Sequence, residues 1–588
     1  MNVGQGFSLA LEQTMGYSKP KGLPYIMSSM EKYVVIIGGV ISGVGKGVAA
    51  ASIGKILKEC GYSVTAIKID PYINYDAGTL RPTEHGEVWV TYDGGEIDQD
   101  LGNYERFLEI PIPRRNNITT GQIYSSIIER ERRGKYLGET VQFIPHVPDE
   151  IKKRIREAGK GYDISIIEIG GTVGDYENIP FLFAVKGMER ELGKENVCYV
   201  LITFLPVPDH IGEMKTKPTQ QAIKLLQENG IIPDIILCRG HKPLDMIRKK
   251  KIETYANIKS EYVISAPDIQ VLYEVPLNFE KEKLGDKLLE KLELPSRKMP
   301  DWKEWRKLVT RIKKPKGKVR IGIIGKYLKI GDYSLKDSYI SINEALIHAG
   351  ARLATEVDIE WLNSDSIISK QLSRLDGILV PGGFGEKGID GKIVAIRYAR
   401  EHDIPFLGLC LGMQLSVVEY ARNVLSMDAD STEFNPHTKI PVVDILPYQR
   451  ELLKEDRYGG TMRLGAYAAY IKEGSLVHKL YERRFKRDMA ISLEPERRGK
   501  VIPDTKYIVE KHRHRYEISP DFVPTLEKGG MLFSGFHQPL NGPRLMEFVE
   551  LSDNKFFVAT QAHPEFTSSL TFPAPLFVGF IEAMGIGH

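Results

Sequence analysis

The chain has 588 residues, of which 42% are hydrophobic and 27% are charged, and this composition is typical of globular proteins. The length is too great for a single hydrophobic core, so two large domains are expected. The 80 Lys and Arg residues nearly balance the 77 Asp and Glu residues, which argues against an overall attraction to nucleic acid or to anionic membranes.

No apolar run approaches the roughly 20 residues that a membrane-spanning helix needs, so the sequence excludes a membrane protein of that class. The four cysteines are scattered, without the paired spacing of zinc ligands. This cysteine usage favours a reducing compartment and predicts a cytoplasmic protein. Residues 1–29 lack a regular apolar pattern and are predicted to form a disordered extension, and Met30 could equally be the true start.

The first domain, residues 30–294, is predicted from alternating strands and helices. An apolar strand at 34–37 precedes a glycine-rich turn and an amphipathic helix, and a second strand follows at 64–69. This order is typical of a parallel βαβ unit with its ligand site at the carboxyl ends of the strands. A further buried strand is expected at 164–169.

A linker is predicted at 295–318, where basic residues surround Trp302 and Trp305. We interpret it as a short helix with a solvated hinge, and a nucleic-acid patch is the alternative. The second domain, residues 319–588, repeats the α/β pattern with strands at 319–324, 378–380 and 405–409. Both domains are therefore predicted to be doubly wound, mostly parallel α/β sheets. The charged segment 482–506 is predicted to be an exposed loop.

A phosphate-binding loop is predicted at GGVISGVGKG, residues 38–47, between a strand and a helix. Its backbone N–H groups and Lys46 suit phosphate oxygens. The segment departs from the usual P-loop pattern because Gly47 stands where a magnesium-binding hydroxyl belongs. Asp100 and Glu168 are the candidate carboxylates that would compensate. A glycine-rich turn without a ligand is the alternative.

A nucleophile is predicted at Cys410, in the strand-to-helix segment GLCLG, which has the form of a nucleophile elbow. His563 would take the thiol proton and Glu565 would orient the imidazole, on the assumption that the chain is extended there. Backbone N–H groups of Gly383 and Leu411 are the candidates for holding the oxyanion. A buried structural cysteine is the alternative interpretation.

The ordered segments PGGFG, GLCLGMQ and HPEF resemble class I glutamine amidotransferases over the C-terminal half. Together with IKIDPYINYDAGT, DQDLGNYERF, IEIGGTVGD, KTKPTQ and HRHRYE, they make the chain similar to the CTP synthase family from about residue 30 onward. The resemblance implies ATP-dependent amination of UTP to CTP, with ammonia from glutamine, in pyrimidine biosynthesis.

The resemblance implies a fuller set of site residues, which includes those already singled out above. For ATP they are Gly43, Val44, Gly45, Lys46, Gly47, Lys68, Asp268 and Ile269. For UTP or CTP they are Ser42, Asp175, Tyr176, Glu177, Lys215, Thr216, Lys217, Pro218, Thr219, Gln220 and Lys251. For glutamine they are Gly383, Leu411, Gly412, Met413, Gln414, Glu433 and Arg515. Asp100 and Glu168 are expected to hold Mg²⁺, with Asp70 as an additional candidate.

The resemblance also implies a homotetramer activated by GTP, and filament assembly is compatible with it. Binding of nucleic acid or membranes is not expected. Two rival interpretations remain open at this point. One is another P-loop amidoligase with a glutaminase half, such as those that amidate cobyrinic acid. The other is a nucleotide-sensing scaffold that polymerises without catalysis. HRHRYE is not taken as a metal site, because its two histidines lack companion ligands in the sequence.

Overall fold

The computed structural model describes residues 31–80, 86–210, 212–325, 329–330, 333–334, 339–367, 369–383, 385, 388–445 and 462–585. The predicted extension, residues 1–29, lies outside this described part of the chain. The fold below is that of the compact unit Glu31–His588.

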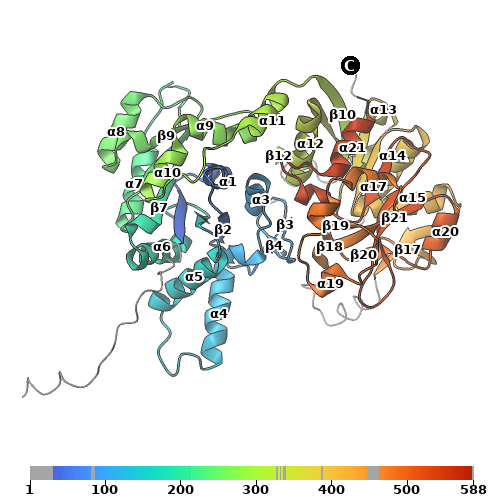
Figure 1. Ribbon diagram of the computed structural model, residues 1–588, viewed down its shortest axis with the longest axis horizontal. Coiled ribbons are helices and arrows are strands. Elements are labelled where there is room, and N and C mark those ends of the chain that lie inside the picture. Colours follow the sequence, from blue (N-terminus) through green and yellow to red (C-terminus); the bar gives the residue numbers. More distant parts are fainter. Residues whose placement is uncertain are drawn as a thin grey trace, which may run out of the picture. The chain divides into compact units, whose positions relative to one another are not determined.

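The N-terminal half contains a seven-stranded parallel sheet in the order β5-β2-β6-β1-β7-β8-β9 (Figure 1). Its strands are β1 Lys32–Gly38, β2 Val64–Asp70, β5 Asn117–Thr119, β6 Ile164–Ile169, β7 Val197–Phe204, β8 Ile235–Gly240 and β9 Val263–Pro267. All strands are nearly fully buried, as expected for a parallel sheet covered on both faces. The predicted βαβ start of this half is confirmed by the parallel pairing of β1 and β2 with β6.

Alternate residues of β1 divide the core between the two faces. Val34 and Ile36 pack with the first helix group, and Val35 and Ile37 pack with the second. The first group is α1 Lys46–Glu59, α3 Asp100–Leu108, α9 Val275–Lys281, α10 Leu284–Lys291 and α11 Lys303–Lys313. The second is α4 Thr120–Arg132, α5 Phe143–Gly159, α6 Ile179–Leu192, α7 Lys217–Glu228 and α8 Met246–Ala256. A short ribbon of β3 Trp89–Val90 and β4 Glu96–Ile97 precedes α3.

The predicted hinge is helical, but it is not solvated throughout. Trp302 and Trp305 are buried and belong to the core of the N-terminal half, and the Trp305 indole donates to the Tyr273 carbonyl at 2.7 Å. The basic residues of the segment obscured this packing, because an amphipathic helix shows its apolar face only at intervals of three or four residues. The next strand, β10, already begins at Gly317.

The C-terminal half contains a nine-stranded sheet in the order β13-β10-β14-β15-β23-β22-β21-β18-β19. The strands are β10 Gly317–Gly325, β13 Thr355–Asn363, β14 Gly377–Val380, β15 Phe406–Leu409, β18 Arg463–Ile471, β19 Tyr507–His514, β21 Leu532–His537, β22 Leu545–Glu550 and β23 Phe557–Thr560. The pairs from β13 to β23 are parallel, and the strands β22, β21, β18 and β19 extend the sheet antiparallel. The α/β fold class is confirmed, and the antiparallel extension is a feature that the sequence did not predict.

Helices cover this sheet on both faces as well. α13 Ser369–Leu372, α14 Ile389–Glu401, α15 Leu411–Asn423 and α20 Val523–Lys528 share one core, and α12 Ile340–Leu353, α17 Leu476–Tyr481, α18 Phe485–Asp488 and α21 Pro575–Ala583 share the other. A small sheet of β16 Ala429–Ser431, β17 Ile440–Ile445 and β20 Tyr516–Ile518 lies beside α15. Two further short strands, β11 Lys329–Ile330 and β12 Tyr333–Ser334, form a hairpin.

The segment 482–506 is not simply an exposed loop. It contains α18 and the short helix α19 Pro495–Arg498, and Phe485 and Asp488 are buried. Arg484 binds Asp488 at 3.0 Å and Glu510 at 2.7 Å, and both carboxylates are buried. The prediction was wrong because the Arg484–Glu510 ion pair and scattered apolar residues such as Ile491 and Leu493, rather than a periodic apolar face, attach this segment to the sheet.

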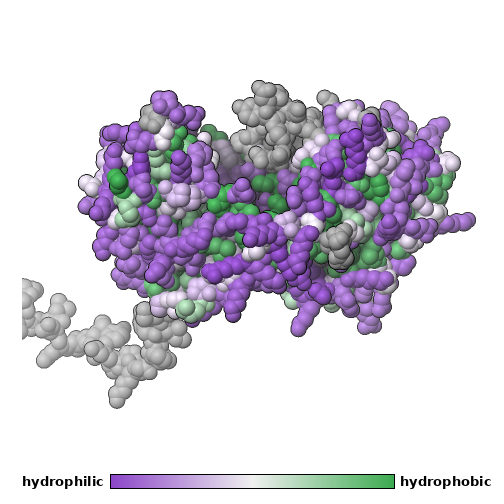
Figure 2. All heavy atoms as spheres, turned by 90° about the horizontal axis from the view of Figure 1, so that it is seen from above, coloured by the Kyte–Doolittle hydropathy of each residue, from purple (hydrophilic) through white to green (hydrophobic). Residues whose placement is uncertain are grey.

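None of the helices in the described part of the chain combines the length and the apolar character needed to cross a bilayer. Hydrophilic residues cover most of the face that Figure 2 shows.

Replacement of Arg484 by Met should destabilise the C-terminal half by about 3–5 kcal/mol, because it leaves two buried carboxylates without their cation. Arg483→Met is the matched control, since Arg483 is exposed. Calorimetry of the two variants should show a lower unfolding midpoint for Arg484→Met only, and equal midpoints would contradict the structural role of this ion pair.

Candidate functional site

The predicted phosphate loop connects β1 to α1, and its backbone adopts the conformations that glycine allows. Gly43 and Gly45 have φ values of 69° and 82°, a region that other residues rarely adopt. Gly45 directly precedes the first turn of α1. The loop therefore presents the N-terminus of α1, with its free N–H groups, at the carboxyl edge of the sheet.

Lys46 lies at the start of α1 and points toward the end of β6. Its ammonium donates to the Gly171 carbonyl at 2.6 Å. Burial lowers the pKa of Lys46, while the nearby carboxylates of Glu168 and Asp100 oppose that shift. The lysine thus sits among acidic groups at the loop, as the sequence analysis expected.

Lys68, on β2, forms ion pairs with three aspartates. Its ammonium is 2.7 Å from Asp100, 3.0 Å from Asp70 and 3.1 Å from Asp98. Burial opposes its charge, but the three carboxylates raise the pKa of Lys68 well above its ordinary value. Asp98 was not among the predicted site residues, and its two-residue spacing from Asp100 was the available signal.

The absence of a hydroxyl at Gly47 has a steric cause. A Cβ atom at this position would lie 2.2 Å from the Asp100 Oδ1 atom, far inside van der Waals contact. The Asp100 carboxylate therefore occupies the space in which a serine or threonine of the usual loop would place its side chain. A larger residue at this position would require the Asp100 carboxylate to move, and that carboxylate is held by Lys68 at 2.7 Å.

Glu168 is the penultimate residue of β6 and accepts a hydrogen bond from the Tyr104 hydroxyl of α3. Burial, with a further contribution from the Asp100 charge, raises the pKa of Glu168 to about 8. Within the described residues no group of three or more His, Cys, Asp or Glu side chains forms a ready-made metal site. Two mutually repelling carboxylates beside a phosphate loop nevertheless suit Mg²⁺, which is commonly bound by one or two carboxylates together with substrate phosphates.

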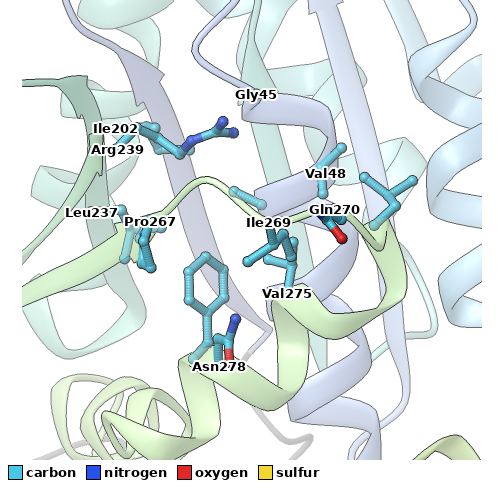
Figure 3. Close-up of a pocket in the computed structure, with 14 residues that line it drawn as sticks. Gly45, Val48, Ile202, Leu237, Arg239, Pro267, Ile269, Gln270, Val275 and Asn278 are labelled. Carbon is cyan, nitrogen blue, oxygen red and sulfur yellow. The ribbon is translucent and has the colours of Figure 1, made fainter. Parts of the chain in front are cut away.

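Beside this loop lies a pocket of about 210 Å³, and Figure 3 shows Arg239 near its Gly45 end and Asn278 at the opposite end. Its walls are mainly apolar and include Ile202, Leu237, Ile269, Val275 and Phe279. Asp268 does not line the pocket, but it pairs with Arg239 at 2.7 Å. A mainly apolar pocket next to a phosphate loop is suited to a nucleobase.

The residues assigned to UTP or CTP are only partly brought together. Asp175 lies close enough to Lys46 to affect its charge, and it accepts from the Thr172 backbone at 2.6 Å. In the segment from Lys215 to Gln220, Thr219 and Gln220 are buried at the start of α7. Ser42, Tyr176, Glu177, Lys217 and Lys251 are exposed.

In the C-terminal half, Cys410 forms a sharp turn between β15 and α15. It has φ 51° and ψ −102°, and its backbone N–H donates to Thr560 at 2.7 Å. Glycine is needed on both sides: a Cβ at Gly408 would lie 2.8 Å from Ala559, and one at Gly412 would lie 2.3 Å from the Val380 carbonyl. Such backbone strain at a buried cysteine is typical of a nucleophile elbow.

His563 and Glu565 complete this arrangement. The imidazole Nδ1 atom and a Glu565 oxygen are 2.7 Å apart. A Cβ placed on Gly382 would be 3.5 Å from the Cys410 Cβ and 3.6 Å from His563 Nε2, so the cysteine and the histidine face the same small space. Burial disfavours the imidazolium, but Glu565 and Cys410 outweigh it and raise the pKa of His563 to about 10.

The local backbone differs from the expectation. Residues Pro564–Thr567 form a 3₁₀ turn rather than an extended segment. The turn still places Glu565 against His563, because a tight turn also brings residues two apart into contact.

Gln561 is a neighbour of the nucleophile that the sequence analysis missed. Its amide donates to the Cys410 sulfur at 3.6 Å and accepts from Gln414 at 3.2 Å. Its place two residues before His563 was the available signal. Of the other residues assigned to glutamine, Leu411, Gly412 and Met413 form the buried start of α15. A Cβ atom at Gly383 would lie 3.7 Å from the Leu411 side chain, so Gly383 is close to this turn. Glu433 accepts from the Gly385 N–H at 2.8 Å. Arg515 is partly buried just after β19.

The two histidines of HRHRYE have companions after all. His512 lies 3.4 Å from Glu547, and His514 lies 3.7 Å from Glu517. Arg463 lies 2.7 Å from Glu547 and 3.5 Å from Glu517. The cation in this buried cluster is therefore an arginine, and burial lowers the pKa values of both histidines. The acids come from distant strands, so the sequence could not reveal them.

Comparison with known proteins matches both halves of the chain. Residues 32–294 match the model of the CTP synthase N-terminus, and residues 334–583 match that of class-I glutamine amidotransferases. The CTP synthase of Methanocaldococcus jannaschii is 50% identical over 563 residues, and that of Pyrococcus abyssi is 51% identical over 558; each comparison covers 94% of this chain and 98% of the relative. A solved structure, the Trypanosoma brucei CTPS glutaminase domain with bound acivicin, is 35% identical, covers 45% of this chain and 93% of that chain, and has a TM-score of 0.39. The chain therefore belongs to the CTP synthase family.

Proposed function

We propose that the protein aminates UTP to CTP with ATP, using ammonia that its C-terminal half releases from glutamine. The observation that carries this proposal is the pairing, in one chain, of a strained and buried Cys410–His563–Glu565 triad with a lysine-bearing phosphate loop. Each site alone fits many enzymes, but a glutaminase combined with a phosphate-activating site is typical of ammonia transfer. The family membership supplies the substrates.

In the C-terminal half, the Cys410 sulfur attacks the carboxamide carbon of glutamine. Protonated His563 donates its proton to the nitrogen as the C–N bond breaks, so that ammonia leaves and a thioester remains. Water, deprotonated by His563, then hydrolyses the thioester to glutamate. Glu565 holds the imidazole in position, and the backbone N–H groups of Gly383 and Leu411 are the candidates for binding the oxyanion.

In the N-terminal half, the 4-carbonyl oxygen of UTP attacks the γ-phosphate of ATP, and ammonia then displaces that phosphate. Residues 43–47 and Lys68 bind the ATP phosphates, and Ile269 lies beside the base, with Asp268 holding Arg239. Asp100 and Glu168, with Asp70, would hold Mg²⁺, which neutralises phosphate charge when bound. Lys46 reaches the terminal phosphates once the nucleotide replaces its contact with Gly171.

UTP is assigned to Ser42, Lys251 and the segment from Lys215 to Gln220, and the CTP amine to Asp175, Tyr176 and Glu177. Several of these side chains are exposed, which fits a site completed by other copies of the chain in a homotetramer.

The same proposal includes GTP activation, filament assembly and a cytoplasmic location. It also includes the domain limits 30–294 and 319–588 and an enclosed route for ammonia between the sites.

Cys410→Ala should abolish glutamine-dependent CTP formation and leave ammonia-dependent formation within about threefold of the wild type, because the thiol acts only on glutamine. The ultraviolet spectrum of cytidine in the product provides the measurement. Loss of both reactions in a folded variant would contradict the division of labour between the halves.

Lys46→Ala should lower CTP formation by about a hundredfold or more with either nitrogen source, since the lysine stabilises charge on the transferred phosphate. The same variant should still hydrolyse glutamine when that reaction is assayed alone. Undiminished CTP synthesis from ammonia would disprove the assignment of the phosphate loop.

Glu565→Gln should move the alkaline limb of glutamine hydrolysis to lower pH. Glu565 is the main group that favours the imidazolium, so its loss lowers the pKa of His563 from about 10, and the proton needed by the leaving ammonia is lost earlier as pH rises. The measurement is kcat/KM for glutamine against pH. An unchanged limb would show that His563 is not the group that donates this proton.

A further inference from the structure

Strand β19 lies at the free edge of the nine-stranded sheet, with β18 as its one partner in that sheet among the described strands. Successive backbone groups of an edge strand point alternately toward its partner and away from it. On the outward side, the Lys511 carbonyl accepts from the His563 N–H at 2.8 Å, and the Arg513 carbonyl oxygen lies 3.9 Å from the Cys410 sulfur. Strand β19 therefore contacts both His563, the acid-base residue of the triad, and Cys410, its nucleophile.

The side chains of the same two residues are held by the N-terminal half. The Lys511 ammonium is fully buried and 2.6 Å from Glu105 of α3, and Arg513 binds Glu96 of β4 at 2.8 Å. Lys511 also lies over the rings of Trp89, at 4.3 Å, and Tyr92, at 4.9 Å. The cation thus sits in a cage that the N-terminal half supplies.

A second contact reaches His563 from the same side. The imidazole stacks on Phe566 at 5.2 Å, and Phe566 packs against Trp89 at 5.0 Å. Trp89 belongs to β3, which contacts β19. Trp89 therefore supports His563 in two ways. It packs on Phe566, which stacks on the imidazole, and it contacts Lys511, whose carbonyl accepts from the His563 N–H.

Glu105 ties this cage to the phosphate site, because it lies in the same helix as Asp100. A separation of five residues corresponds to roughly 7.5 Å along the helix axis. Asp100, the first residue of α3, binds Lys68 and lies close to Gly47. Glu105, the sixth residue, binds Lys511 of β19. Figure 1 shows α3 with β3 and β4 between the two sheets.

We infer that Lys511 and Arg513 are positioning residues, through which the N-terminal half sets the geometry of the glutaminase triad. Their ion pairs fix β19, and β19 fixes Cys410 and His563. This inference rests on the proposed glutaminase function of the triad. Burial lowers the pKa of Lys511 and raises that of Glu105. Removing both charges from water therefore costs free energy that an apolar contact would not cost. A positioning role accounts for an ion pair at this place.

The test separates positioning from mere stability with three variants. Lys511→Met removes the cation and keeps the apolar stem. The double variant Lys511→Met with Glu105→Gln also removes the orphaned buried charge, so it should recover thermal stability. Lys511→Arg keeps the ion pair. The matched control is Ser341→Ala, which removes a 2.7 Å hydrogen bond from Arg106 to α12, another contact between the halves that does not involve β19.

We expect Lys511→Met and the double variant to lose about tenfold or more in kcat for glutamine hydrolysis, because a shift of about 1 Å at a reacting group can cost that much or more. Ammonia-dependent CTP formation should stay near the wild-type rate in both. Lys511→Arg and Ser341→Ala should retain hydrolysis. Alkylation of Cys410 by iodoacetamide, located by mass spectrometry, should slow in parallel with hydrolysis.

If the double variant recovered glutamine hydrolysis as well as thermal stability, the inference would be overturned. That result would show that Lys511→Met lowers activity only because it leaves the buried Glu105 carboxylate without a cation. Unchanged hydrolysis in Lys511→Met would overturn it as well. Alkylation keeps the two proposals distinguishable. If the wild type did not hydrolyse glutamine, the proposed function would fail, and the alkylation rates of Lys511→Met and the wild type would still decide whether Lys511 positions the thiol.

Discussion

The contact between the Asp100 carboxylate and the backbone of Gly47 is the constraint on which the N-terminal site depends. It brings the start of α3 next to the phosphate loop, and it favours glycine where the usual loop pattern has a hydroxyl. Lys68 neutralises Asp100 from the neighbouring strand. The Asp100 carboxylate therefore connects the phosphate loop, β2 and α3 through one ion pair and one close approach.

The C-terminal site follows the same physical logic with different groups. Gly412 packs closely on the Val380 carbonyl, and this packing fits the sharp turn at the buried Cys410. The buried His563–Glu565 pair places a charged imidazole–carboxylate pair beside this turn. In both sites a glycine leaves room for a functional side chain: Gly47 for Asp100, and Gly412 for the turn at Cys410. A buried contact then orients a group of the site, namely Lys68 with Asp100 and Glu565 with His563. The strain is tolerated because the surrounding strands are fully packed.

The two sites share more structure than their separate sheets suggest. α3 begins at the phosphate loop and reaches β19, whose carbonyls contact the triad. A rigid helix and a strand held by buried ion pairs can carry a displacement from one site to the other, because neither deforms gradually. The placement of charged pairs at this junction is therefore of functional interest even though such pairs add little net stability.

The sequence by itself determined the two α/β halves, the phosphate loop at Lys46 and the order of Cys410, His563 and Glu565, because these depend on local periodicity and on glycine spacing. Only the tertiary structure decided what lies far apart in the chain. It placed Asp98 on Lys68, buried Trp302 and Trp305, gave His512 and His514 their acidic partners, and brought Lys511 to Glu105 across about 400 residues. Pairings of this kind arise when separate strands and helices pack, and no local pattern of residue types encodes them.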